Sequence, residues 1–352
     1  MFTGIFEKFI SFIPAYWWGF VILIFIIAFC IFILEKGSDL IVEHSVNLSA
    51  KWGLPKMLIG ATIISLGTTL PEFTLSLMSA GRGLSGFALG NAVGSVICNS
   101  GLIIGLCAII RTLPYKRKYL TFQNRYQFAC GFLLVITAFI YSLTKNINPF
   151  KLGSRIPQVM GFVFLLLLIP YVAVTIRMAQ KAGIDDDVVL EPGIKSRNRN
   201  DTLRTLFYLL LGCLIVVVAS DLLIPSVKEF AQRLHTPDSV IASTLIALGT
   251  ALPELVTGVK AAKRGHGDLA IGNVIGSDIL NILFVAGASA SITPHGLGID
   301  KKFFILMFPA MLIILAVFRL AIKYSRDGIR RPVGIVLLSL YIAFVILSYI
   351  FR

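Results

Sequence analysis

Long hydrophobic stretches recur along nearly the whole chain, and short polar or basic segments separate them. Their lengths match the roughly 20 apolar residues that an α-helix needs to cross a bilayer. The pattern therefore predicts an all-α polytopic membrane protein with ten transmembrane helices. We expect these at about 15–35 (with a polar extension to about 50), 56–80, 85–110, 126–144, 158–178, 204–232, 238–262, 267–291, 302–322 and 332–350.

The composition supports a membrane protein and excludes other classes. Of the 352 residues, 57% are hydrophobic and only 14% are charged, whereas about a quarter of a soluble protein is charged. A soluble globular enzyme, a disordered chain and a collagen-like rod are therefore excluded. The five cysteines lie in apolar stretches and form no CxxC pair, so we interpret them as small buried apolar residues.

The distribution of basic residues predicts the orientation. The loops after spans one, three, five, seven and nine carry 21 Lys and Arg, and the other loops with the two termini carry 10. Because the side richer in Lys and Arg faces the cytoplasm, we expect a multi-pass protein of the plasma membrane with both termini outside and the 178–203 loop inside. The Asp185–Asp187 run in that loop reads as part of a solvated linker, with a small regulatory cation site as the alternative.

An internal repeat is the most informative feature of the sequence. Segment 60–105 aligns without a gap to 242–287, at an offset of 182 residues, with 19 identities in 46 positions. Ser38-Asp39-Leu40 matches Ser220-Asp221-Leu222 in the same register. This similarity indicates a duplication, and inverted repeats of this kind build secondary transporters.

The repeat predicts the domain organisation. Residues 1–178 form a first repeat, 179–203 a cytoplasmic linker and 204–352 a second repeat. Each repeat holds five spans, and an odd number of spans forces the two copies into opposite orientations in the membrane. We therefore expect two inverted five-helix repeats, with a substrate site near the bilayer midplane where they meet.

Each repeat carries an acidic motif in the middle of a hydrophobic span. Repeat one reads Gly67-Thr68-Thr69-Leu70-Pro71-Glu72, and repeat two reads Gly249-Thr250-Ala251-Leu252-Pro253-Glu254. A proline inside a helix frees the backbone carbonyl four residues earlier, and a carboxylate at mid-membrane costs about 2.5–3.5 kcal/mol on insertion scales. Carboxylates, hydroxyls and freed carbonyls are oxygen ligands that suit Ca²⁺ or Na⁺ and not zinc or copper. The alternative is a buried acid that is hydrogen-bonded in a helix break.

The following span of each repeat carries a polar stripe. Asn91, Ser95 and Asn99 are spaced by four residues, as are Asn273, Ser277 and Asn281, so each trio shares one helical face. The glycines between them, Gly90 with Gly94 and Gly272 with Gly276, form small-xxx-small patches that we interpret as packing surfaces. The Asn and Ser stripe either bonds neighbouring helices or completes an ion cage through Ser95, Asn99, Ser277 and Asn281.

These two motifs, each present twice, resemble the α-repeats of the cation/Ca²⁺ exchanger superfamily, in particular those of the prokaryotic Na⁺/Ca²⁺ exchangers. The resemblance implies a central Ca²⁺ site formed by Glu72 and Glu254 with Thr68 and Thr250. It also implies flanking Na⁺ sites that use Ser95, Ser277 and the backbone oxygens near Ser65 and Ala247, with Asn99 and Asn281 at the middle of the cage. Thr69 and Asp278 are further candidates.

Two departures from the family pattern bear on the counter-ion. Ala251 stands where family members often have Ser, and Asn281 stands where several have Asp. Asp278 lies three residues before Asn281, about 60° around the helix, and faces either the cage from another angle or a cytoplasmic vestibule. These departures leave the number of Na⁺ ions and competition by protons open.

The resemblance implies a secondary active antiporter that exchanges Na⁺ for Ca²⁺ by alternating access and expels cytoplasmic Ca²⁺. The alternative is a Ca²⁺/H⁺ or K⁺-dependent exchanger on the same fold. A cation channel more often builds its filter from several subunits, and no motif of an intramembrane enzyme is present. The expected partners are Ca²⁺, Na⁺ and the lipid bilayer, without nucleic acid or a resident cofactor. The sequence allows a monomer but does not fix the oligomeric state.

Overall fold

A computed structural model describes residues 3–13, 16–52, 56–115, 117–182, 199–233, 251–325 and 328–350. Helices form almost all of this part of the chain. In the first half they are α1 (Thr3–Ser11), α2 (Trp17–Trp52), α3 (Lys56–Ile59), α4 (Ser65–Thr68), α5 (Leu70–Gly81), α6 (Ser85–Ile97), α7 (Ile104–Ile110), α8 (Arg117–Thr144), α9 (Pro149–Leu152) and α10 (Gln158–Ala182). In the second half they are α11 (Arg199–Arg233), α14 (Leu252–Lys263), α15 (Gly267–Leu280), α16 (Gly287–Ile292), α17 (Phe308–Tyr324) and α18 (Arg331–Ile350).

Several helices, some of them continued through π-helical turns, are long and apolar enough to cross a membrane. Among the described residues, eight helices meet that description, and the bent pair 56–68 with 70–81 makes a ninth. The remaining expected span, 238–262, falls largely on residues 234–250, which lie outside the described part of the chain. The multi-pass helical architecture predicted from hydropathy is confirmed.

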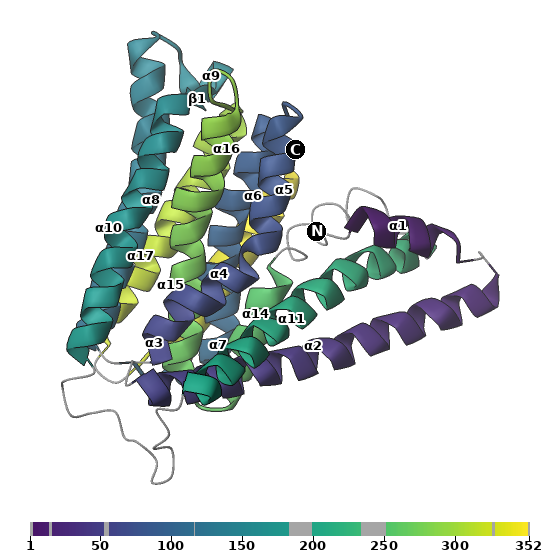
Figure 1. Ribbon diagram of the computed structural model, residues 1–352. Coiled ribbons are helices and arrows are strands. Elements are labelled where there is room, and N and C mark those ends of the chain that lie inside the picture. Colours follow the sequence, from purple (N-terminus) through teal and green to yellow (C-terminus); the bar gives the residue numbers. More distant parts are fainter. Residues whose placement is uncertain are drawn as a thin grey trace.

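The helices form two groups in space. Figure 1 shows α2 and α11 side by side and inclined to a bundle that contains α8, α10, α15 and α17. Glycines let α2 and α11 approach closely, because a Cβ at Gly37 would lie 2.7 Å from Val216 Cγ2 and one at Gly212 would lie 3.0 Å from the Gly37 oxygen. These two helices are the first long helix of each half of the chain.

The two halves of the chain repeat one order of elements around the acidic motifs. Helix α5 in the first half corresponds to α14 in the second, and both start two residues before the motif glutamate. Helices α6 and α7 are joined by a π-helical turn, η2 (Cys98–Ile103), and α15 and α16 by η4 (Asn281–Ala286). A further π-turn, η1 (Gly60–Ile64), joins α3 to α4. Such turns are frequent at functional sites.

Glycines bring α15 into backbone contact with the segment before α5. A Cβ at Gly272 would lie 2.1 Å from the Met57 oxygen, and one at Gly276 would lie 2.6 Å from both the Ala61 oxygen and Ser65 Oγ. The packing role predicted for this glycine pair is confirmed. The positions that correspond to Met57 and Ala61 in the second repeat are 239 and 243, outside the described residues.

The structure differs from the sequence-based expectation at several boundaries. Helix α8 begins at Arg117, before the expected start at 126, because its polar residues Gln123 and Asn124 are buried against neighbouring helices and the segment is no loop. Helices α10 and α11 extend to Ala182 and from Arg199, beyond the expected ends at 178 and 204.

The structure also contains a short antiparallel strand pair, which the all-α prediction does not include. Strand β1 (Ser154–Ile156) pairs with β2 (Leu297–Ile299), with Arg155 opposite Gly298. A π-turn, η5 (Phe303–Met307), follows β2 and leads into α17. The strands join the connection after α8 to the one after α16, and three residues each are too few to give a periodic signal in the sequence.

The contact at Gly276 gives a testable prediction for folding. Gly276→Ala would place a methyl group against the Ala61 backbone, and overpacking of this kind typically costs about 1–3 kcal/mol. We expect a lower midpoint of thermal unfolding in detergent. Gly86→Ala is the control, because no described residue lies within 4 Å of a Cβ there, and we expect it not to lower the midpoint. Equal midpoints for the two variants would contradict the packing described here.

Candidate cation-binding site

Both acidic motifs lie at the start of a helix. Pro71 and Pro253 occupy the first turn of α5 and α14, where the missing N–H would be unpaired in any case. Thr69 and Ala251 precede these helices with nearly equal backbone angles, φ −81° and ψ −3° against φ −85° and ψ 4°. The chain bends by 46° between the segments 56–68 and 70–81. The span is therefore broken into two helices. This is a larger change than the single backbone hydrogen bond that a proline inside a continuous helix would remove.

Both glutamates lie in the interior at helix N-termini. Glu72 is 1% exposed and Glu254 is 0% exposed, and each lies in the first turn of its helix. The two carboxyl groups interact electrostatically. Helix N-termini carry partial positive charge and stabilise a negative group. Among the described residues, neither glutamate forms an ion pair with a basic side chain, so the helix ends give the only positive potential seen there.

Hydroxyl groups from both repeats converge on Glu254. Ser277 Oγ of α15 donates to Glu254 Oε1 over 3.3 Å, and Thr69 Oγ1 lies 3.2 Å from Ser277 Oγ and 3.4 Å from Glu254 Oε1. The Thr68 hydroxyl is buried and donates to the Ser65 oxygen over 3.5 Å. Thr69, a further candidate from the sequence, is therefore the threonine of the first repeat that contacts the acid of the second.

Several buried oxygens of this cluster accept no hydrogen bond from the described residues. They are both carboxylate oxygens of Glu72, Glu254 Oε2, Asn99 Oδ1 and Asn281 Oδ1. Buried polar atoms almost always have a partner, and each exception requires an explanation. These are acceptor oxygens, which fit Ca²⁺ or Na⁺ as a ligand.

The other expected site residues divide into three groups. Ser65 and Ser95 are buried, and Ser65 Oγ donates to the Thr62 oxygen over 3.1 Å. Asn99 and Asn281 lie in the equivalent π-turns η2 and η4. Thr250 and Ala247, like the Asp185–Asp187 run, lie outside the described residues.

Asn91 of the polar stripe bonds a neighbouring helix. Its side-chain nitrogen donates to the Glu72 backbone oxygen over 3.2 Å and to Ser76 Oγ over 2.9 Å. The interpretation as an interhelical hydrogen bond is confirmed for this residue. Asn91 fixes α6 against α5 beside the first glutamate.

Asp278 belongs to a second polar cluster, next to the first. It is 0% exposed, and its Oδ2 accepts from Ser100 Oγ and from Gln127 Nε2, each over 2.6 Å. Gln127 Oε1 accepts in turn from Asn124 Nδ2 over 3.0 Å. Its Oδ1 accepts no hydrogen bond from the described residues. The carboxylate therefore faces the interior and not a vestibule, and its neighbours in the sequence, Ser277 and, through Ser100, Asn99, belong to the glutamate cluster.

Gln127 and Asn124 were missed by the sequence analysis. With Gln123 they form a polar group at spacings of three and four on α8, and all three are buried. Polar residues that share one face of a hydrophobic span are the signal that could have identified them.

Comparison with known proteins agrees with this geometry. The family model for the sodium/calcium exchanger protein matches residues 21–177 and again residues 204–350. The chain belongs to the sodium/calcium exchanger family. Members of this family are transporters rather than enzymes. The two separate matches each cover one of the two halves that share the acidic motif.

Relatives of the family cover almost the full chain. The sodium/calcium exchanger MaX1 of Methanosarcina acetivorans is 30% identical over 338 residues, which are 90% of this chain and 96% of that protein. The uncharacterized membrane protein MJ0091 of Methanocaldococcus jannaschii is 32% identical over 88% of this chain and 92% of its own length. A solved structure of the sodium-calcium exchanger NCX_Mj, soaked without Na⁺ and Ca²⁺, has a TM-score of 0.76 at 29% identity and covers 94% of this chain and 99% of its own.

The hydroxyl contacts of Glu254 give a prediction for this exchanger family member. Thr69→Val keeps the shape of the side chain and removes the hydroxyl that faces Glu254 and Ser277. Since one hydrogen bond contributes about 1 kcal/mol, we expect a roughly fivefold lower Ca²⁺ affinity by calorimetric titration. Thr74→Val is the matched control, because the Thr74 hydroxyl donates to the Leu70 oxygen of its own helix and, among the described residues, forms no hydrogen bond with Glu254 or Ser277. An unchanged affinity in Thr69→Val would remove Thr69 from the site.

Proposed function

We propose that this protein is a secondary active antiporter that exchanges Na⁺ for Ca²⁺ by alternating access and expels Ca²⁺ from the cytoplasm. One observation carries the proposal: two buried glutamates at equivalent helix starts, Glu72 and Glu254, with acceptor oxygens that no described residue satisfies. Membership of the sodium/calcium exchanger family supports Na⁺ and Ca²⁺ as the transported ions.

The proposed ligand set consists of oxygen atoms. Ca²⁺ takes six to eight such ligands and accepts carboxylates, hydroxyls and carbonyls. We propose that it binds between Glu72 and Glu254, with Thr68 and Thr250. The proposed Na⁺ ligands and cage residues are Ser95, Ser277, Asn99, Asn281, Thr69 and the backbone near Ser65 and Ala247.

Charge balance explains why such a site would exchange ions and not leak them. Two ionised glutamates give the centre a charge of −2. One Ca²⁺ or two Na⁺ cancel this charge, and a third Na⁺ would leave +1. Because a buried unpaired charge is strongly disfavoured, the loaded forms can be occluded while the empty form cannot. Alternating access combined with this rule gives obligatory exchange, and inward Na⁺ movement would drive Ca²⁺ out.

Asp278 is a third acidic group next to the site. Its two donors, Ser100 and Gln127, are neutral, and no described residue gives it a basic partner. We propose that it contributes to cation selection from this second polar cluster, outside the charge balance of the two glutamates.

The membrane arrangement is part of the proposal. We propose ten spans in two inverted five-helix repeats, both termini outside and the 178–203 loop in the cytoplasm, in the plasma membrane. The equal order of elements around Glu72 and Glu254 and the separate family matches to 21–177 and 204–350 support the two repeats. The excess of Lys and Arg in the odd-numbered loops supports the orientation.

The moving part is proposed to be the α2–α11 pair. These helices contact each other along their length and are inclined to the bundle that holds the carboxylates (Figure 1). A pair that slides as one unit past α5 and α14 could open the site to either side in turn. A crosslink that fixed α2 to the bundle and left exchange intact would contradict this movement.

Ion flux in proteoliposomes tests the function. We expect ⁴⁵Ca²⁺ uptake into vesicles preloaded with Na⁺, and no uptake into vesicles preloaded with K⁺ or choline. Glu254→Gln removes one charge of the pair and should abolish uptake. Glu229→Gln is the control, because Glu229 lies on α11 in an ion pair with Arg233, outside the site.

The other outcomes separate the alternatives. Uptake driven only by a proton gradient would make the protein a Ca²⁺/H⁺ exchanger, and uptake that also needs K⁺ would make it a K⁺-dependent exchanger. Uptake that needs no counter-ion at all would indicate a channel. Each of these results would contradict simple Na⁺/Ca²⁺ exchange.

A further inference from the structure

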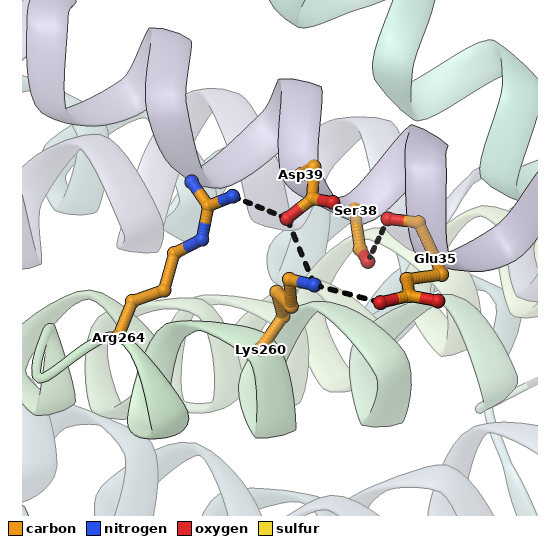
Figure 2. A network of polar contacts seen from close by, with 5 residues as sticks. All are labelled: Glu35, Ser38, Asp39, Lys260 and Arg264. Atoms are coloured by element: carbon orange, nitrogen blue, oxygen red, sulfur yellow. Dashed lines mark hydrogen bonds and ion pairs between the residues drawn. The ribbon is translucent and has the colours of Figure 1, made fainter.

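Charged side chains connect α2 to α14 near one end of the bundle. Asp39 of α2 forms ion pairs with Arg264 and, over 2.9 Å, with Lys260, and Glu35 pairs with Lys260 over 3.2 Å. Figure 2 shows the four charged residues facing one another across the two helices, with Ser38 Oγ donating to the Glu35 backbone oxygen. Glu35 and Asp39 are four residues apart, as are Lys260 and Arg264, so each pair lies on one helical face.

The internal repeat gives this contact an equivalent elsewhere in the molecule. At the offset of 182, Asp39 corresponds to Asp221 and Arg264 corresponds to Arg82. Both arginines follow the last residue of the helix that starts with the acidic motif, Arg82 after α5 and Arg264 after α14. Both aspartates lie on the first long helix of their half, α2 and α11. Both repeats therefore have an aspartate and an arginine at the two equivalent positions.

Only one of the two equivalent pairs is formed in this structure. Arg264 is bonded to Asp39, whereas Arg82 is exposed and makes no ion pair with the described residues. Asp221 of α11 is 6% exposed. The acid of the second pair is therefore buried while its arginine is exposed, and no ion pair joins these two described residues.

We propose that Asp39–Arg264 and Asp221–Arg82 are two alternating latches, each of which holds the site closed on one side of the membrane. The proposal rests on the exchange function above. In the proposed orientation the Asp39–Arg264 latch is cytoplasmic and the Asp221–Arg82 latch is extracellular. The structure then corresponds to the state that is closed to the cytoplasm. Movement of the α2–α11 pair breaks the first latch and forms the second.

The two latches are unequal in strength. The cytoplasmic one has an additional bridge, Lys260 with Glu35, whereas the equivalent positions in the other repeat are Met78 and Val217. Charges on partly exposed side chains contribute little singly but more in a network. The additional bridge favours closure on the cytoplasmic side, so the carrier without bound ions rests open to the outside.

The half-saturating Ca²⁺ concentration on each side of the membrane tests the latches. It is measured by Na⁺-dependent ⁴⁵Ca²⁺ flux in right-side-out and inside-out vesicles. Arg264→Gln destabilises the state closed to the cytoplasm, so we expect cytoplasmic affinity to rise and extracellular affinity to fall, each by about fivefold. Arg82→Gln should shift both affinities in the opposite directions. A merely structural role for either arginine would not produce opposite shifts.

Controls separate the latch from a general loss of stability. Lys263→Gln removes a charge next to Arg264 that takes no part in the network, and it should change neither affinity. Glu35→Val with Lys260→Met copies the composition of the other latch and should give part of the Arg264→Gln shift. In that background, exchanging the charges as Asp39→Arg with Arg264→Asp should restore both affinities to those of the Glu35→Val, Lys260→Met variant, because the ion pair forms again in the reverse sense.

The outcomes distinguish the latch from the function on which it rests. Absence of Na⁺-dependent flux in the unmodified protein would contradict the exchange function itself. Flux in that protein, together with shifts of Arg264→Gln and Arg82→Gln in the same direction, or with no shift in either, would overturn the latch alone. If Arg264→Gln does not fold, the charge-exchanged variant decides, and its failure to restore the affinities would likewise overturn the latch.

Discussion

Two carboxylates in a low-dielectric interior, without a basic partner among the described residues, are the constraint on which the rest of the structure depends. Removing ions from water costs several kcal/mol each even after relaxation, so Glu72 and Glu254 require compensation. The protein supplies part of it with helix N-termini and hydroxyl groups. These donors stabilise the charges but do not neutralise them, and the unsatisfied oxygens of both residues remain. We propose that cations supply the remainder, which would make the bound ion part of the energetics of every occluded state.

The surrounding architecture serves that arrangement. Helices α5 and α14 hold the glutamates in their first turns, and π-turns hold Asn99 and Asn281 at equivalent positions. Backbone contact at Gly272 and Gly276 brings α15, with Ser277, close to the threonines of the other repeat. Neither repeat completes the site alone, because Thr69 of the first contacts the acid of the second. The duplication therefore produces one shared site and not two.

Much of this could be predicted from the sequence, because bilayer thickness fixes span length and the repeat marks the acidic motifs. The positions of Glu72, Glu254 and Ser277 follow from that symmetry, whereas Thr69 stands opposite Ala251 in the alignment of the repeats. The partners of Asp278 do not, since Gln127 comes from α8, outside both repeated segments, and only tertiary packing brings it near. The ion pair of Asp39 could not be predicted either, because the repeat marks Asp39 and Asp221 as equivalent but does not indicate their partners. Arg264, the partner of Asp39, lies 225 residues away along the chain, beyond any local pattern.

Competition between the two ions at equilibrium tests the shared site most directly. Ca²⁺ binding to the purified protein would be measured by calorimetry at increasing Na⁺, with choline holding the ionic strength constant. A site of charge −2 predicts that the apparent Ca²⁺ dissociation constant rises with more than the first power of the Na⁺ concentration, since at least two Na⁺ replace one Ca²⁺. It also predicts that Glu72→Gln and Glu254→Gln each abolish the binding. Ca²⁺ binding that is indifferent to Na⁺, or that survives in both variants, would contradict the account.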